Sequence, residues 1–172
     1  KHAKDLEAVL AYVRKTYPGK LYIVAHSMGT FVTTLLNPPD IEKAVLSGTP
    51  NSNTQFIMER LIKRFNSKPG GKVDINGISL VPRSTGEIQK FGPQFWKTLR
   101  EYNPIASFTQ FGSHTKTLII HPKQDDVVRL EFQEEYDAVP NATVLWIDGD
   151  HSFKKAEDRK VYVQEIRSFF TK

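Results

Sequence analysis

The chain has 172 residues, of which 39% are apolar and 25% are charged, values typical of a folded domain with a sizeable core and not of a disordered or collagen-like chain. The 24 Lys and Arg exceed the 19 Asp and Glu by only 5, and without a long basic arm we expect no nucleic-acid partner. There are no cysteines, which excludes disulfides, thiolate metal sites and a cysteine nucleophile.

Helices and strands alternate over the first fifty residues. Apolar residues recur with helical spacing in 3–15, which predicts an amphipathic helix that the following Pro-Gly pair ends. A short, continuously apolar run at 21–25 predicts a strand covered on both faces, as in a parallel sheet. A helix over 28–36 and a second buried strand over 43–47 are predicted next.

The rest of the chain returns to this alternation only after a different segment, 51–107, which we interpret as an inserted, mainly helical cap. The further elements predicted are helices at 56–65 and 95–102, strands at 117–120 and 143–147, a helical stretch at 130–138 and a last helix at 156–170. We therefore expect an α/β fold with a parallel sheet, its core formed by 1–50 and 108–172.

The most informative segment is Ala25-His26-Ser27-Met28-Gly29, between a predicted strand and a predicted helix. A sharp strand-to-helix turn exposes a serine hydroxyl, and the small residues Ala25 and Gly29 suit such a crowded turn. The N–H of Met28 would then point toward a developing oxyanion. The alternative is that Ser27 only caps the following helix, and we interpret His26 as a packing residue.

This segment resembles the nucleophile elbow of the α/β-hydrolase superfamily, in which the chain order is nucleophile, acid, histidine. The loop that begins at Pro122 resembles the family's acid loop, where an aspartate precedes one variable and two apolar residues. That match selects Asp125, with Asp126 as the alternative if the spacing slips by one. Further on, Gly-Asp-His-Ser-Phe resembles the family's histidine loop and places His151 as the base.

The resemblance implies a serine hydrolase with a Ser27–His151–Asp125 triad and the Met28 N–H in the oxyanion hole. Asp148 and Asp150 flank His151, but two carboxylates and one imidazole within a turn lack metal-ligand spacing. We therefore expect neither a metal nor a cofactor. His121 follows a strand near the acid loop and is expected to pack there.

The resemblance also implies that the insertion at 51–107 is a lid that selects the substrate. Its apolar side chains could roof a pocket for an acyl or aromatic group, or bury the lid against the core. A basic run within it contains no acidic residue and could attract an anionic substrate or a membrane surface; we favour a solvated helix face. The run consists of Arg60, Lys63, Arg64, Lys68 and Lys72.

The predicted function is cleavage of a carboxylic ester through an acyl-enzyme. A thioesterase or an aminopeptidase-like amidase is the alternative within this chemistry, and a non-catalytic binding module of the same fold is the alternative from another class. The expected partner is a small-molecule ester or acyl substrate, with no membrane-surface contact. The absence of cysteines and of a signal sequence favours a cytoplasmic location.

Family members usually carry about four strands before the elbow strand, and a loop of that region supplies the second oxyanion donor. Here one predicted helix and one predicted strand precede Ser27. The chain is interpreted either as the C-terminal part of a longer hydrolase, which the absent initiator Met favours, or as a compact variant with a four-stranded sheet. An exposed edge at the 21–25 strand would favour oligomers.

Overall fold

The computed structural model describes residues 2–83 and 85–172. The chain divides into two compact units: the first runs to Ser52 and resumes at Pro104, and the second is Asn53–Asn103. Within the described residues, no helix has the length and apolar character needed to cross a bilayer.

A four-stranded sheet forms the centre of the first unit, and all its neighbouring strands are parallel. This confirms the predicted parallel sheet, because the four strands are those expected from the apolar runs. Their order across the sheet is β1 (Leu21–His26), β2 (Ile41–Ser47), β5 (Lys116–Pro122) and β6 (Ala142–Ile147). Parallel strands place their carboxyl ends at one edge, so the loops after β1, β5 and β6 meet there.

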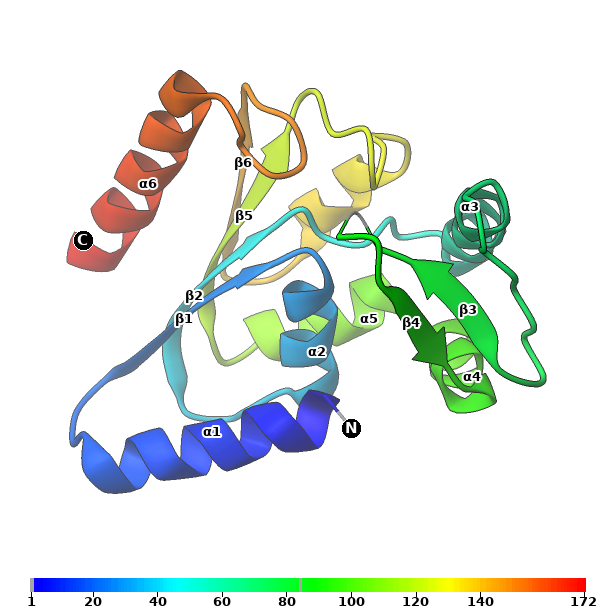
Figure 1. The fold of residues 1–172 in the computed structure, drawn as a ribbon. Helices are drawn as coiled ribbons and strands as arrows, with labels where there is room; N and C mark the ends of the chain where they lie inside the picture. The colour runs from blue at the N-terminus through cyan, green and yellow to red at the C-terminus, as the bar shows by residue number, and fades with distance from the viewer. Residues whose placement is uncertain (1, 84) are drawn as a thin grey trace. The chain divides into compact units, whose positions relative to one another are not determined.

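Helices cover both faces of this sheet (Figure 1). The helical elements of the unit are α1 (His2–Thr16), α2 (Met28–Leu36), α5 (Pro104–Gly112), the short 3-10 helix η1 (Gln133–Ala138) and α6 (Ala156–Thr171). Only η1 occupies the stretch predicted as helical at 130–138, and α5 was not predicted. The helix α5 is hard to predict from its composition. It begins with a proline, its apolar residues include two phenylalanines, and it has no charged residues to mark a polar face.

Two apolar clusters hold the helices to opposite faces of the sheet. Along β2, Ala44 and Leu46 belong to one cluster and Val45 to the other, as expected when successive side chains of a strand alternate between faces. The first cluster includes Phe108 and Phe111 of α5. The second is covered by the aromatic side of α6. The result is a three-layer α/β/α unit whose central strands are buried on both sides.

Strand β1 departs from the prediction that both of its faces are covered. It is the outermost strand of the sheet, and Tyr22 and Val24 are 40% and 49% exposed. Tyr22 stacks on Phe170 near the end of α6, with ring centroids 5.1 Å apart, but α6 packs mainly over β6, at the other side of the sheet. One face of β1 is therefore only partly covered.

The second unit has its own core. It contains α3 (Thr54–Asn66), β3 (Ser79–Pro82), β4 (Ile88–Phe91) and α4 (Pro93–Glu101), with β3 and β4 antiparallel. Trp96 is fully buried, and its indole N–H donates to the Ser79 hydroxyl at 2.9 Å. The rings of Phe65 and Phe95 contact it. From the sequence alone, these aromatic residues could either line a substrate pocket or be buried. In the structure they pack with one another.

Candidate active site

The turn between β1 and α2 holds Ser27 in a backbone conformation that non-glycine residues rarely adopt, with φ 53° and ψ −122°. Positive φ costs free energy in a residue with a Cβ and is tolerated where the surroundings enforce it. Here the Ser27 N–H donates to the Ser47 carbonyl at 2.8 Å. A Cβ added at Gly29 would lie 3.7 Å from that of Ala25, an ordinary contact, so the turn has room for small residues at both positions.

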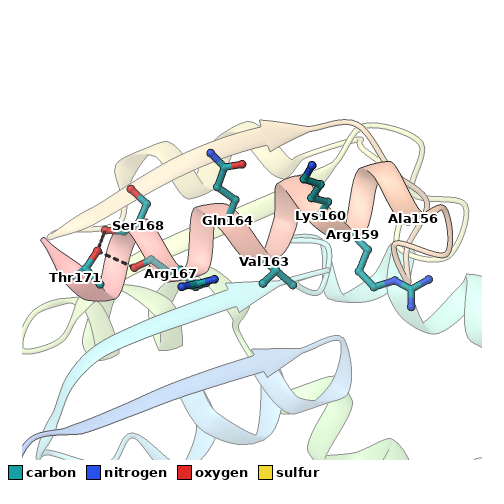
Figure 2. A pocket seen from close by; sticks show the side chains of 8 residues that line it. All are labelled: Ala156, Arg159, Lys160, Val163, Gln164, Arg167, Ser168 and Thr171. Atoms are coloured by element: carbon teal, nitrogen blue, oxygen red, sulfur yellow. Dashed lines mark hydrogen bonds between the residues drawn. The ribbon is translucent and has the colours of Figure 1, made fainter.

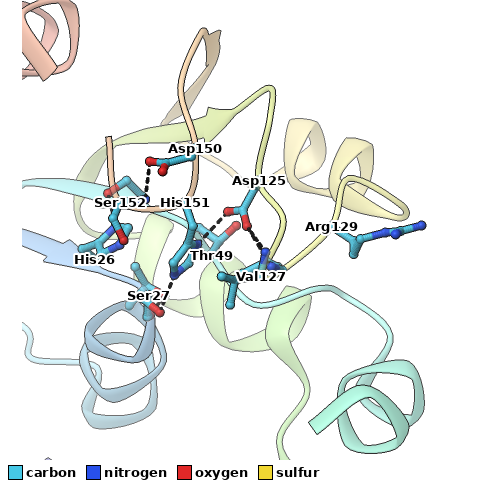
Figure 3. A network of polar contacts seen from close by, with 12 residues as sticks. His26, Ser27, Thr49, Asp125, Val127, Arg129, Asp150, His151 and Ser152 are labelled. Atoms are coloured by element: carbon cyan, nitrogen blue, oxygen red, sulfur yellow. Dashed lines mark hydrogen bonds and ion pairs between the residues drawn. The ribbon is translucent and has the colours of Figure 1, made fainter. Parts of the chain in front are cut away.

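Three side chains from three loops form a continuous hydrogen-bond chain in the first unit (Figure 3). The Ser27 hydroxyl lies 2.9 Å from His151 Nε2, and His151 Nδ1 lies 2.7 Å from Asp125 Oδ2. These are the residues that the elbow, acid-loop and histidine-loop patterns single out. Ser27 lies 124 positions from His151 in sequence, and Asp125 lies 26 positions from it. The carboxyl edge of the parallel sheet brings the three residues together.

Asp125 is only 7% exposed, and its carboxylate accepts hydrogen bonds on both oxygens. Oδ1 accepts the N–H groups of Val127 and Val128, each at 2.8 Å, while Oδ2 faces His151. Burial by itself raises the pKa of Asp125, but the hydrogen bonds from His151, Val128 and Val127 outweigh it, and the pKa is lowered. The group is thus an anion at neutral pH that can stabilise a positive charge on His151.

The loop after β5 and the loop after β6 are fastened to each other. The Gln124 N–H donates to the Gly149 carbonyl at 3.0 Å, and the Gln124 side-chain oxygen accepts the Gly149 N–H at 2.6 Å. Gly149 has φ 144°, which a residue with a Cβ rarely adopts. This pair of bonds joins the two loops within two residues of both Asp125 and His151.

The remaining candidate residues have identifiable surroundings. Met28 is the first residue of α2, so its N–H is one of the helix-end amides that have no intrahelical acceptor. Asp126, the alternative acid, is exposed. His121 is 2% exposed and its ring packs against Tyr136 and Trp146. Burial lowers the pKa of His121 to about 4, and a smaller opposing effect comes from Asp125.

The two carboxylates that flank His151 are both engaged, Asp150 within its own loop and Asp148 with the loop after β5. Asp150 Oδ1 accepts the N–H groups of Ser152 and Lys154 at 3.1 and 3.0 Å, and Asp148 forms an ion pair with Lys123 at 3.4 Å. Over residues 2–83 and 85–172, no group of three or more His, Asp or Glu side chains is arranged to hold a metal ion.

A surface hollow lies along one face of α6 (Figure 2). Its lining comes from this helix alone, and neither Ser27, Asp125 nor His151 contributes to it. The lining residues are Ala156, Arg159, Lys160, Val163, Gln164, Arg167, Ser168 and Thr171. Because the hollow is lined by one helix and by none of the three hydrogen-bonded residues, we do not assign a substrate to it.

Sequence reasoning did not single out Gly48, which lies beside His151, or the two hydroxyl residues that link His26 to α6. Ser47 and Gly48 end β2 and begin the next loop, and Tyr162 lies on α6. The Ser47 hydroxyl bridges His26 Nδ1 and the Tyr162 hydroxyl at 3.1 and 2.9 Å. None of these residues belongs to a recognisable motif, and only the fold shows that they are neighbours.

The fold is that of the α/β-hydrolases. An esterase domain of a Rhodothermus marinus protein superposes with a TM-score of 0.72 at 16% identity, over 98% of this chain and 68% of that one. Est1E from Butyrivibrio proteoclasticus gives 0.71 at 18% identity, over 98% and 68%. A Paleococcus ferrophilus monoacylglycerol lipase gives 0.61 at 14% identity, over 97% and 74%. No family model and no curated protein matches the chain.

Proposed function

We propose that the chain is a serine hydrolase that cleaves carboxylic esters through an acyl-enzyme intermediate. The observation that carries the proposal is the chain of bonds from Ser27 Oγ to His151 at 2.9 Å and from His151 to Asp125 at 2.7 Å. The strained Ser27 turn and the esterases and lipases among the structurally similar proteins support it. A serine that only capped α2 would use its hydroxyl on the helix, and Ser27 makes no such side-chain bond.

In the proposed reaction, the Ser27 oxygen attacks the acyl carbon while its proton passes to His151 Nε2. Asp125 accepts the Nδ1–H of the imidazolium and stabilises its charge. The N–H of Met28 donates to the oxyanion of the tetrahedral intermediate. The carbon–oxygen bond to the leaving alcohol then breaks, and His151 returns the proton to that oxygen.

Deacylation repeats these steps with water as the nucleophile. His151 takes a proton from the water as its oxygen attacks the acyl carbon, and the intermediate collapses to release the carboxylic acid and the Ser27 hydroxyl. Every proton transfer in the cycle uses Nε2, because Nδ1 stays engaged with Asp125. No step requires a cofactor.

We further propose that the second unit, Asn53–Asn103, serves as the lid that selects the acyl group, with an aromatic acyl ester as the substrate class. The support is one of the similar structures, Est1E, which was solved with ferulic acid, at a TM-score of 0.71 and 16% identity. Within the second unit, the rings of Phe65, Phe95 and Trp96 pack with one another, whereas the apolar side chains of Met58 and Leu61 are partly exposed.

The test is hydrolysis of matched p-nitrophenyl and thiophenyl esters, with acetyl and cinnamoyl acyl groups, followed in the first turnover. An ester-cleaving enzyme releases p-nitrophenol above the uncatalysed rate, with a burst approaching the enzyme concentration where deacylation is the slower step, and this release disappears in Ser27→Ala. Faster acylation by the thiophenyl esters, beyond their intrinsic reactivity, would favour the thioesterase alternative. Folded protein that releases no leaving group above the uncatalysed rate from any of the esters would contradict the proposal and favour a binding module.

A further inference from the structure

The imidazole of His151 lies in a narrow seat whose walls are His26 and Gly48. The rings of His26 and His151 are 4.8 Å apart at an interplanar angle of 48°. A Cβ added at Gly48 would come within 2.9 Å of His151 Cε1 and 3.0 Å of His26 Cε1, so Gly48 lies beside both rings and a side chain there would collide with them. Gly48 also has φ 57°. The two rings therefore pack against each other, and both lie close to the backbone of Gly48.

His26 is itself held in place by two hydroxyl groups. Its Nδ1 lies 3.1 Å from Ser47 Oγ, and that oxygen lies 2.9 Å from the Tyr162 hydroxyl. Ser47 is fully buried, and the Tyr162 ring stacks on Phe153 at 4.3 Å, two residues after His151. The three residues come from β1, β2 and α6, so the bonds tie the Ser27 turn to the helix that follows the histidine loop.

We propose that His26, fixed by Ser47 and Tyr162, is a positioning residue that holds His151 in line between Ser27 and Asp125. The inference rests on the proposed function, since it assigns a role in presenting the base. Misplacement of a reacting group by about 1 Å can cost about 100-fold in rate. If His26 did not pack on it, the His151 ring could shift by a fraction of this distance and the rate would fall accordingly.

The charge state of His26 fits this role. Burial and then the neighbouring His151 lower the pKa of His26, against smaller opposing effects of Asp125 and of the Ser47 backbone. At neutral pH the ring is therefore uncharged. An uncharged ring does not repel the imidazolium that forms on His151 when Ser27 attacks, whereas a lysine or arginine at this position would.

The test compares Ser47→Ala and Tyr162→Phe with a matched control, Tyr136→Phe. Ser47→Ala removes the bridging hydroxyl but keeps the carbonyl that accepts the Ser27 N–H. Tyr162→Phe keeps the stacked ring and removes only its hydroxyl. The control deletes another hydroxyl bond of the same unit, from Tyr136 to the Pro50 carbonyl at 2.6 Å.

The first measurement is the rate of fluorophosphonate labelling, together with kcat and KM for p-nitrophenyl acetate. We expect Ser47→Ala to slow labelling and lower kcat by about tenfold with KM unchanged, and Tyr162→Phe to have a smaller effect that is not additive with it. The control should label at the wild-type rate with a similar loss of thermal stability. Equal labelling rates for Ser47→Ala and wild type, or an equal slowing in the control, would overturn the inference.

The second measurement does not depend on activity. Ring nitrogen and carbon spectra of the histidines report the tautomer and hydrogen bonding of His151 in the folded protein. We expect Ser47→Ala to shift or broaden the His151 signals, and Tyr136→Phe to leave them in place; unchanged His151 signals in Ser47→Ala would refute the role of His26. If the wild-type chain is not labelled at all, the proposed function fails, and these spectra alone decide whether the seat exists.

Discussion

Replacing His121 by phenylalanine should remove a pH-dependent part of the folding free energy. The side chain is 2% exposed between aromatic rings, and its Nε2 has no hydrogen-bond partner within the described part of the chain. Burial lowers its pKa from 6.5 to about 4. Between these two values the unfolded chain binds a proton at this site and the folded chain does not.

The sign follows from that difference in bound protons. The stability that this site contributes is fully present above about pH 6.5 and is lost progressively as the pH falls to about 4. The difference between the two pKa values corresponds to about 3 kcal/mol of unfolding free energy. The free energy of unfolding of a typical domain is only about 5–15 kcal/mol, so this contribution is a large fraction of it.

The assay is urea unfolding of wild type and His121→Phe across this pH range. Phenylalanine keeps a ring of similar size and cannot be protonated, so the wild type should lose about 3 kcal/mol more than the variant on acidification. His114→Gln, which deletes an exposed imidazole, controls for the general effect of losing a histidine. Parallel stability curves for wild type and His121→Phe would refute the argument that this ring is buried uncharged.

Three further substitutions test separate parts of the structure. Asp125→Asn should slow fluorophosphonate labelling by about 10³–10⁴-fold because the imidazole loses its anionic partner, whereas the neighbouring Asp126→Asn should label at the wild-type rate; the reverse order would exchange their roles. Gly48→Ala should lower the labelling rate by at least about tenfold, since its Cβ would collide with two imidazole rings; a rate equal to wild type would mean that the rings have room to move. Trp96→Phe should destabilise the second unit by about 1–3 kcal/mol in calorimetry, because the bond to Ser79 is lost in a fully buried site, and an unchanged unfolding temperature would contradict that.

Much of the first unit could be predicted because its strands are short apolar runs between turn residues. The runs at 21–25 and 43–47 lie within β1 and β2, and the serine turn between a strand and a helix lies where the pattern puts it. The resemblance of two later loops to the family's acid and histidine loops, in the family's chain order, then selected Asp125 and His151, and the loops after parallel strands share one edge of the sheet.

The parts that were missed depend on contacts distant in sequence. The strands β3 and β4 have four residues each, too few to show a clear alternation, and one of them ends in proline. The exposure of Tyr22 follows from the position of β1 at the edge of the sheet, which a run of apolar residues does not reveal. The bond between Ser47 and Tyr162 joins residues 115 positions apart, and neither residue type signals a partner.

The central claim is that Ser27 is activated by His151 held by Asp125. The most direct measurement is labelling of the folded chain with a fluorophosphonate, followed by mass spectrometry of its peptides. The account predicts one phosphonylated residue, Ser27, with labelling lost in Ser27→Ala and slowed by orders of magnitude in His151→Ala. Labelling at another serine, or equal labelling of Ser27 when His151 is absent, would contradict it.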